Sequence, residues 1–172
     1  EALIPIKLQT EPKIGEVLGL SLTHTYGSIQ KFEVIATEGS GRIIPLGSMM
    51  RVMRESLRAS YEYISRNHKA LGIKADFKND FDISVLATQM GIPKEGASAG
   101  ITILIGLVSA LTKKPVKHNI AMTGEITLKG KIVAVNGIQE KIVAAVENGI
   151  HKVFIPKENQ REFKNLPSDI KN

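Results

Sequence analysis

"KEGASAGITILIGLVSAL" spans residues 94–111 and joins a stretch rich in glycine and alanine to a long apolar segment. From Ser98 onward the segment is apolar on all sides and longer than ten residues, which predicts a buried helix that begins near Ser98. Small residues leave space where another group must approach the backbone closely. A serine at this point is either a helix N-cap, which is the commoner role, or a nucleophile.

The segments around this helix predict a mixture of hairpins and helices, which is typical of the α+β class. Two apolar runs, 17–22 and 32–35, flank Tyr26-Gly27-Ser28 and predict a β-hairpin. Residues 48–68 lack glycine and proline, and their apolar positions repeat at helical spacing, so we expect an amphipathic helix capped by Ser48 with Val52 on its apolar face. Further strands are expected within 40–47 (with Pro45 at a sheet edge or a bulge), 81–88, 119–137 (with a turn at Lys129-Gly130) and 151–156. Further helices are expected at 138–149, ended by Gly149, and at 157–166.

The composition fits one compact domain. The chain has 172 residues, 42% of them hydrophobic, which is enough for one core and short for two. It begins at Glu1, so we expect it to be a piece of a longer protein. No apolar run reaches transmembrane length and no basic and apolar leader opens the chain, so no membrane partner is expected. The absence of cysteine excludes disulfides, a cysteine nucleophile and thiolate metal ligands, and it fits a reducing compartment.

Several other kinds of site are disfavoured by the sequence. The four histidines lie far apart without an HxxxH or HxH pair, so no metal site is expected. Neither GxxxxGKS/T nor GxGxxG occurs, so no common nucleotide-phosphate loop is present. The 23 basic and 17 acidic residues give a net charge of +6, which permits nucleic-acid binding. Such binding is not indicated, because the lysines are scattered and aromatic residues make up only 5%.

Lys141 is a candidate general base. On the helix expected at 138–149, Ile138, Ile142, Ala145 and Val146 form an apolar stripe, and Lys141 lies at its margin, about 60° from the centre. Such a lysine either extends to solvent, the commoner case, or is held inside, where loss of solvation lowers its pKa. A shift of about three units would make it a usable general base at neutral pH.

Two segments resemble a known family. "PKEGASAG" (93–100) and "NIAMTGEITLKGKIVAVNGIQEKIVAAVENGIHKVFIPKEN" (119–159) are similar to the proteolytic domain of Lon, the ATP-dependent AAA+ protease. The first half of the chain is similar more loosely, through "GEVLGLSL" (15–22), "EGSGRIIPLGSMMRVMRES" (38–56) and "DFDISV" (80–85). The two motifs and the interval between them agree with the family in order and spacing.

The resemblance implies roles for three residues. Ser98 matches the nucleophile in the family's PKDGPSAG-like motif. Lys141 matches the catalytic lysine in its GGLKEK-like sequence. Thr123, in "MTGE", matches a threonine that helps to hold the lysine amine. The resemblance therefore favours the nucleophile over the cap for Ser98.

The loop before Ser98 shows how this chain departs from the family. Glu95 stands where the family usually has aspartate, and Ala97 replaces the usual proline. With Gly96, these residues belong to a loop, 91–97, that we expect to gate the site and to support the oxyanion. "NGIQEK" replaces a double-glycine version of the lysine motif, so a somewhat divergent member is expected.

The resemblance also implies a fold and a function. The expected fold is the α+β Lon proteolytic domain (ribosomal protein S5 domain 2-like) over residues 14–172, preceded by a connecting segment, 1–13, from an upstream AAA+ module. The expected activity is that of a cytoplasmic serine endopeptidase with a Ser-Lys dyad, which degrades unfolded or misfolded proteins as part of a hexameric ring. ATP and magnesium would belong to the upstream module, and no cofactor is expected in this domain.

Two other functions remain to be weighed. The chain could be a Lon-like scaffold that builds the ring of an AAA+ protein acting on nucleic acid; the retention of both Ser98 and Lys141 argues against this, because a scaffold needs neither. An isolated binding module of unrelated fold would make the paired motifs a coincidence.

Overall fold

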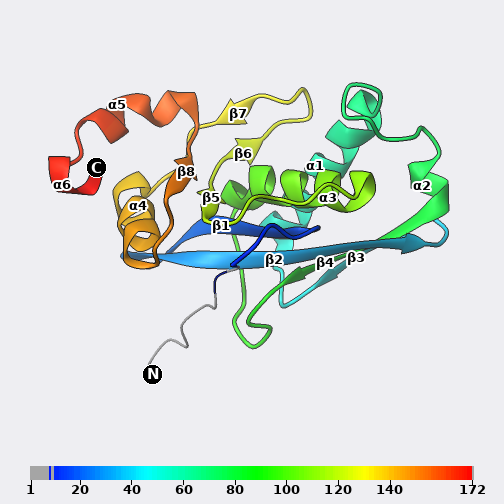
Figure 1. Ribbon diagram of the computed structural model, residues 1–172, viewed down its shortest axis with the longest axis horizontal. Coiled ribbons are helices and arrows are strands. Elements are labelled where there is room, and N and C mark those ends of the chain that lie inside the picture. Colours follow the sequence, from blue (N-terminus) through cyan, green and yellow to red (C-terminus); the bar gives the residue numbers. More distant parts are fainter. Residues whose placement is uncertain (1–7, 9, 172) are drawn as a thin grey trace.

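A six-stranded sheet lies at the centre of the molecule, and two long helices cover one of its faces (Figure 1). The computed structural model of the chain describes residue 8 and residues 10–171. The strand order is β3-β4-β2-β1-β5-β8, and β6 and β7 form a separate two-stranded sheet. The strands are β1 (Glu16–Thr23), β2 (Tyr26–Glu38), β3 (Ile43–Leu46), β4 (Phe81–Ala87), β5 (Ile120–Met122), β6 (Glu125–Ile126), β7 (Ile132–Val133) and β8 (Lys152–Phe154).

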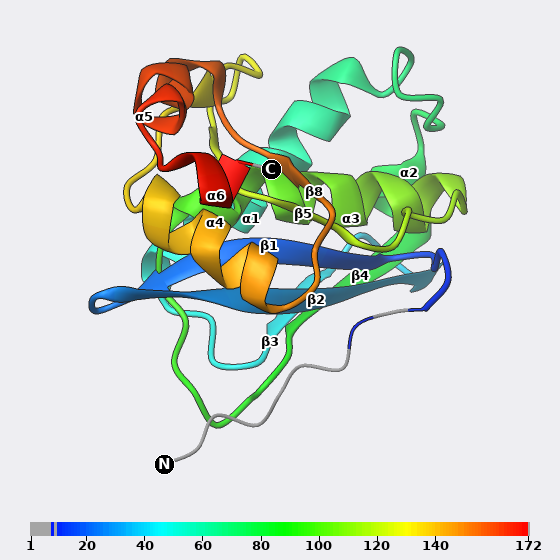
Figure 2. The same cartoon turned by 60° about the vertical axis from the view of Figure 1, so that its left-hand side comes forward.

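The helices occupy both faces and one end of this sheet. Strands β1, β2 and β4 pair antiparallel, whereas β3–β4, β1–β5 and β5–β8 pair parallel, so the sheet is mixed and the predicted α+β class is confirmed. Helices α1 and α3 lie side by side above the sheet, and α4 to α6 lie at one end (Figures 1 and 2). The helices are α1 (Arg51–Asn67), α2 (Phe77–Asp80), α3 (Gly100–Thr112), α4 (Ile138–Glu147), α5 (Gln160–Lys164) and α6 (Ser168–Lys171), with 3₁₀ turns at Ala97–Ala99 and Lys157–Asn159.

Strand β1 is buried on both faces and separates α3 from α4. Gly19 faces α3, where the Thr102 hydroxyl oxygen lies 3.2 Å from the place that a Cβ would take. Leu18 and Leu20 point to the other face and pack with Ala145 of α4. Successive side chains of a strand point to opposite faces, so one strand contacts both helices.

Most predicted elements are present with shifted boundaries. The hairpin is confirmed, although β1 ends at Thr23 and β2 begins at Tyr26, so the turn lies before Tyr26-Gly27-Ser28. Pro45 lies in the edge strand β3, and Gly149, with φ of 72°, follows α4 as predicted. Helices α2 and α6 were not predicted, because four residues are too few for a periodic signal.

The N-terminal prediction for α1 is wrong. The helix begins at Arg51, and its N-cap is Met50, which makes no side-chain capping bond. Ser48 has a φ of 58°, and its hydroxyl donates to the carbonyl oxygen of Met90 at 2.5 Å. The chain therefore reverses at Ser48 before the helix starts, and this residue cannot cap it.

The helical faces also differ from the prediction at three positions. Val52 and Val146, expected on apolar stripes, are 39% and 54% exposed. Each lies beside a buried residue of its helix, Met53 or Ala145, so the helix turns the valine itself to the outer side. Ser98 lies in the 3₁₀ turn before α3, whose N-cap is Ala99 without a side-chain capping bond, so the structure does not support the N-cap role.

The N-terminal segment is described only in part. Of the connecting segment expected at 1–13, residues 1–7 and 9 lie outside the described residues. Lys13 forms an antiparallel bridge with Val116. Over residue 8 and residues 10–171, no helix has both the length and the apolar character needed to cross a membrane.

Gly27 lets the hairpin press against α4. A Cβ at Gly27 would lie 2.2 Å from the carbonyl oxygen of Glu140 and 2.9 Å from the amide nitrogen of Lys141. Both distances are far below van der Waals contact, so any larger residue would displace the first turn of α4. The hairpin thus fixes the position of the turn that carries Lys141.

We expect Gly27→Ala to lower the free energy of unfolding by about 1–3 kcal/mol, because the added methyl group overpacks this contact. Urea denaturation measures the change. Gly91→Ala is the matched control, because nothing lies within 4 Å of the place its Cβ would take. Its unfolding free energy should change by less than about 0.5 kcal/mol. Equal effects of the two substitutions would contradict the tight contact.

Candidate active site

Lys141 is buried, although its position in sequence is at the margin of an apolar stripe. Its side chain comes from the first turn of α4, and the residue is only 2% exposed. Its neighbours on the same helix, Ile138 and Ile142, pack with Leu166, which fixes the rotation of α4 about its axis. The Lys141 amine donates a hydrogen bond to the hydroxyl oxygen of Thr123 at 3.1 Å.

Burial changes the acidity of this amine. Loss of solvation lowers the pKa of Lys141 from 10.5 to about 8, against the opposing effect of the Glu162 and Glu140 carboxylates, which raise it. Thr123 is 1% exposed and contributes a neutral hydroxyl, which can accept from the amine or donate to it. The amine is therefore far closer to its neutral form at pH 7–8 than a lysine in solvent would be.

Ser98, in the turn before α3, is held by the segment that follows β5. Its carbonyl oxygen accepts a hydrogen bond from the amide of Gly124 at 2.9 Å, and the carbonyl oxygen of Gly124 accepts from the amide of Ile101 at 3.0 Å. Gly100 follows directly, and a Cβ there would lie 3.0 Å from the Ile126 side chain. Small residues therefore permit the close packing of this turn against the segment after β5.

The two predicted catalytic residues meet at Thr123-Gly124. Thr123 holds the Lys141 amine through its side chain, and Gly124 holds Ser98 through its backbone. Within residue 8 and residues 10–171, no hydrogen bond joins the Ser98 hydroxyl directly to the Lys141 amine. The structure thus attaches both residues to one dipeptide after β5, Lys141 through its side chain and Ser98 through its backbone.

A groove of about 910 Å³ lies beside Ser98. Its walls are the tip of the β1–β2 hairpin, the loop that follows β4 and the exposed side of α4. Ser98 and Ala99 line the groove, whereas Lys141 does not. Residues from the three walls include Leu22, Tyr26, Ile92, Glu95, Gln139, Val143 and Glu147.

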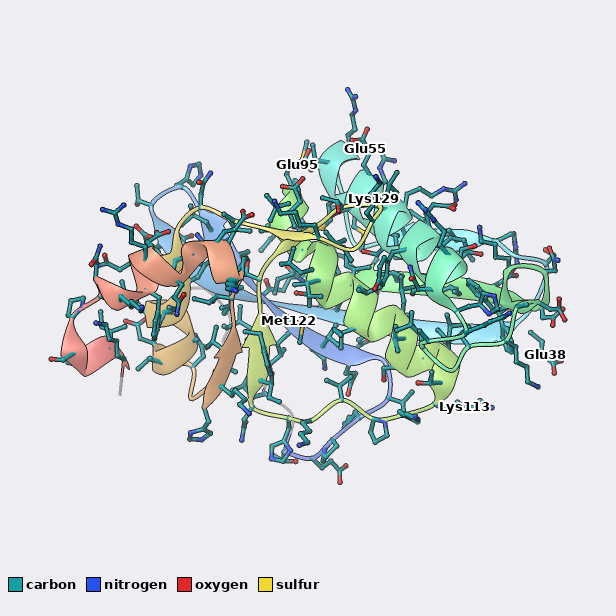
Figure 3. The ribbon with its side chains drawn as sticks, turned by 90° about the horizontal axis from the view of Figure 1, so that it is seen from above. Glu38, Glu55, Glu95, Lys113, Met122 and Lys129 are labelled. Atoms are coloured by element: carbon teal, nitrogen blue, oxygen red, sulfur yellow. The ribbon has the colours of Figure 1, made fainter. Side chains whose placement is uncertain are left out.

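The predicted gating residues lie beside the start of α1. The carboxylate of Glu95 accepts hydrogen bonds from the amide of Met53 at 3.0 Å and from the amide of Gly96 at 3.1 Å. Figure 3 shows Glu95 near Glu55, at the N-terminal end of α1. Glu95 thus caps α1 from another part of the chain, which accounts for the missing side-chain cap at Met50.

The sequence analysis missed two serines that hold the turn around Ser98. On the buried face of α1, the Ser56 hydroxyl donates to the carbonyl oxygen of Ala97 at 3.2 Å, and the Ser60 hydroxyl donates to that of Gly100 at 3.0 Å. Two serines four residues apart on an otherwise apolar helical face form a signal that could have identified them.

A buried amide that the sequence analysis also missed fixes the approach to α4. Asn159 donates to the carbonyl oxygen of Val135 at 2.9 Å and accepts from the amide of Val135 at 3.0 Å. It also donates to the carboxylate of Glu162 at 3.1 Å. No local pattern marks this asparagine, because its partners lie in a different segment.

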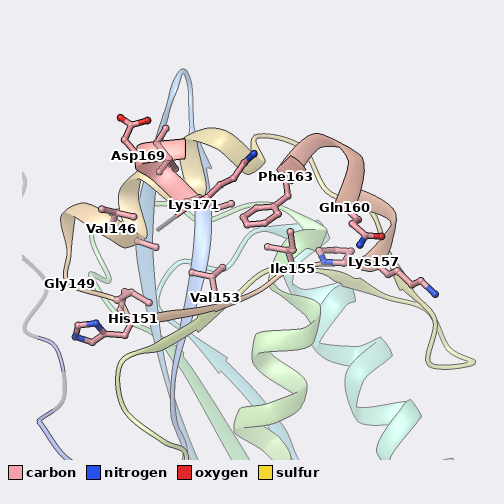
Figure 4. Close-up of a pocket in the computed structure, with 15 residues that line it drawn as sticks. Val146, Gly149, His151, Val153, Ile155, Lys157, Gln160, Phe163, Asp169 and Lys171 are labelled. Atoms are coloured by element: carbon pink, nitrogen blue, oxygen red, sulfur yellow. The ribbon is translucent and has the colours of Figure 1, made fainter. Parts of the chain in front are cut away.

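A second hollow lies on the other side of α4. It has a volume of about 700 Å³ and is lined by side chains of α4, β8, α5 and α6 (Figure 4). Its lining is largely apolar, including Ile142, Val153, Ile155 and Phe163, and contains neither Ser98 nor Lys141. Of the residues with candidate chemistry, Ser98 and Glu95 line the groove, and Lys141 lines neither hollow.

The pKa of Lys141 predicts a pH-dependent stability. Because the folded pKa lies below that of the unfolded chain, the unfolded state binds the proton more tightly between about pH 8 and 10.5. Relative to Lys141→Met, the wild type should therefore gain unfolding free energy as the pH rises through this window, on the order of 3 kcal/mol in total. Urea denaturation at several pH values measures the difference, and a difference that stays constant from pH 7 to pH 10 would show an ordinary lysine.

Comparisons with known proteins identify the family of the chain. The family model of the Lon protease (S16) C-terminal proteolytic domain matches residues 4–172. The chain is 43% identical over 165 residues to the Lon protease of Finegoldia magna, covering 96% of the chain and 21% of that protein. It is 40% identical over 166 residues to Lon protease 1 of Thermus thermophilus, covering 96% and 21%. The Lon protease of Mesomycoplasma hyopneumoniae is 43% identical over 167 residues, covering 97% and 19%.

The chain spans about a fifth of the length of the curated relatives it matches. The matched part is the proteolytic portion, so the family supports a protease role and the class of serine peptidases. The fold, the two predicted motifs and these matches together show that the chain belongs to the Lon protease family, as its C-terminal proteolytic domain.

Proposed function

We propose that this domain hydrolyses peptide bonds with Ser98 as the nucleophile and Lys141 as the general base. The observation that carries the proposal is the buried Lys141 amine, whose pKa is lowered to about 8. This amine donates a hydrogen bond to Thr123, and the next residue, Gly124, donates its amide hydrogen bond to Ser98. Burying a lysine that makes no hydrogen bond to a carboxylate lowers the stability of the fold. A function that uses the neutral amine explains why a lysine occupies such a position. A general base is the use that the neighbouring serine suggests.

The reaction follows from these groups. The neutral Lys141 amine takes the hydroxyl proton of Ser98, whose oxygen forms a bond to the peptide carbonyl carbon. The resulting oxyanion is held by backbone N–H groups of the turn around Ser98. Lys141 then gives its proton to the leaving amine as the C–N bond breaks. Water releases the acyl group in the same way, with Lys141 as the base and the Ser98 hydroxyl restored.

Thr123 has a positioning role in this proposal. Its hydroxyl lies 3.1 Å from the Lys141 amine and is itself buried, so it restricts the directions in which the amine can point. A neutral amine keeps one lone pair, and a hydrogen bond donated to Thr123 leaves that lone pair for the Ser98 proton.

The wider function is proposed from the family. We infer that unfolded or misfolded polypeptides are the substrates, that the domain works in a hexameric ring, and that the protein is cytoplasmic. An AAA+ module of the whole protein would use ATP and magnesium to deliver the substrate. The hydrolytic step proposed for this domain needs no cofactor.

The dyad is tested by hydrolysis of a short, unstructured fluorogenic peptide, which requires no ATP-driven unfolding. Ser98→Ala and Lys141→Met should each lower kcat by roughly a thousand-fold or more, and Thr123→Val by about ten-fold. The wild-type rate should rise as Lys141 loses its proton, with an apparent pKa near 8.

Two exposed residues serve as matched controls. Ser40→Ala and Lys69→Met should keep the wild-type rate, because both side chains lie at the surface, away from the groove. A wild type without peptidase activity at concentrations where it forms rings would refute the dyad and favour the scaffold function in an AAA+ protein acting on nucleic acid.

Glu95 gives a separate test of the proposed gating loop, 91–97. Glu95→Ala removes the acceptor for the Met53 and Gly96 amides, so it should loosen the loop, lower the peptidase rate of the assembled protein and destabilise α1 by about 1 kcal/mol. Glu95→Gln keeps one acceptor oxygen and should have a smaller effect on both quantities. An unchanged rate for Glu95→Ala in an assembled sample would remove the gating role.

A further inference from the structure

Lys94 is a second buried lysine, and its environment differs from that of Lys141. The residue is 7% exposed. Among the ion pairs of residue 8 and residues 10–171, none includes Lys94. An ammonium group taken out of water without a carboxylate must be satisfied by other acceptors, or it destabilises the fold.

Three backbone carbonyl groups supply these acceptors. The Lys94 amine donates to the carbonyl oxygens of Gly47 at 3.0 Å and Ala87 at 3.5 Å, and also to that of Gln89. A lysine ammonium has three N–H donors, so this set of acceptors matches the protonated form. Burial lowers the pKa of Lys94 from 10.5.

The backbone around the ammonium adopts uncommon conformations. Gly47, Ser48 and Gln89 have φ values of 89°, 58° and 63°. For Ser48 and Gln89 this left-handed conformation is unfavourable, and it persists only where the surroundings enforce it. A Cβ on Gly47 would lie 1.9 Å from the carbonyl oxygen of Ala87, so only glycine permits this approach of two acceptors of the ammonium.

The main chain of Lys94 joins the same two segments. Its amide donates to the carbonyl oxygen of Ser48 at 3.0 Å, and its carbonyl oxygen accepts from the amide of Met50 at 2.8 Å. The loop after β4 and the loop between β3 and α1 lie side by side in both views (Figures 1 and 2). Lys94 therefore connects these loops through its side chain and its backbone together.

This connection lies directly before the proposed nucleophile. Lys94, Glu95 and Ser98 all line the groove, and only Gly96 and Ala97 separate the anchored pair from Ser98. Gly96 has a φ of 124°, a conformation that glycine adopts far more readily than other residues, so the chain changes direction between the anchored pair and Ser98. The path of the chain into the turn at Ser98 thus depends on what holds the residues before it.

We propose that Lys94 is a positioning residue for Ser98, with its ammonium group holding the loop 89–97 against the carbonyl oxygens of Gly47, Ala87 and Gln89. This inference rests on the proposed peptidase function. Lys94 does not take part in proton transfer, because its donors are directed to backbone carbonyl groups instead of the reacting atoms.

The first test removes the charge and keeps the apolar stem. Lys94→Met should lower kcat for the fluorogenic peptide by about 10- to 100-fold, because a small displacement of the nucleophile is enough for such a loss. Hydrogen exchange should accelerate by about ten-fold or more at the amides of Met50, Ile92 and position 94, and stay unchanged in α3. Lys69→Met, at an exposed position, should change neither quantity.

The second test separates charge from packing. Because the chain has no cysteine, Lys94→Cys introduces a unique thiol. Alkylation in denaturant with 2-bromoethylamine gives an ammonium side chain of the length of lysine, and 1-bromopropane gives a neutral side chain of the same length. After refolding, the aminoethyl form should recover kcat to within about three-fold of the wild type, and the propyl form should remain as slow as Lys94→Met.

The possible outcomes are distinguishable. Equal recovery by the two alkylated forms, or a Lys94→Met variant with the wild-type kcat, would overturn the positioning role. If only the aminoethyl form refolds, Lys94 is required for the fold as a whole, and the specific role is overturned as well. A wild type without peptidase activity at concentrations where it forms rings would refute the proposed function alone. Hydrogen exchange would still test whether Lys94 anchors the loop. Unchanged exchange rates in Lys94→Met would refute this anchoring.

Discussion

The burial of the Lys141 amine is the constraint on which the surrounding structure depends. A charged amine in this position would be unfavourable, and its surroundings supply a neutral hydroxyl, that of Thr123, as its hydrogen-bond partner. The position of the amine is set by α4, and the position of α4 is set by the hairpin that contacts it at Gly27. The absence of a side chain on one residue of a strand therefore determines how deeply a lysine on a helix is buried.

The sheet determines how the two halves of the candidate site meet. Ser98 belongs to the layer of α1 and α3, whereas Lys141 belongs to α4 on the opposite face. Strand β1 lies between the layers, and β5 beside it leads into Thr123-Gly124, where the two halves are joined. Residues far apart in the chain are thus held at a fixed spacing by a single central sheet, which is more rigid than any loop that could connect them.

The sequence predicted the elements of this fold better than the contacts between them. Apolar periodicity was sufficient for α1 and α4, because each buries a continuous face, and the length of a wholly apolar segment was sufficient for α3. It could not decide whether Lys141 points inward, since the answer depends on Gly27 and Thr123, which lie in other segments. The same limit explains the error at Ser48. A serine before an apolar run is a typical N-cap, but here its backbone is bound to Lys94, and the capping acceptor is Glu95. Resemblance to a family located Ser98 and Thr123 but gave no information on what holds them.

The loop before Ser98 is held by two neighbouring side chains of opposite charge, each of which binds backbone groups. The Lys94 ammonium binds carbonyl oxygens, and the Glu95 carboxylate binds amides. The backbone groups that these side chains bind are fixed by the fold, so the position of the loop before Ser98 depends on the positions of β3, β4 and the start of α1. Lys141 takes its position from the hairpin and β5 instead. Because β2 pairs with both β1 and β4, the sheet joins the two sets of contacts, and Thr123-Gly124 joins them again at the residues proposed as nucleophile and base.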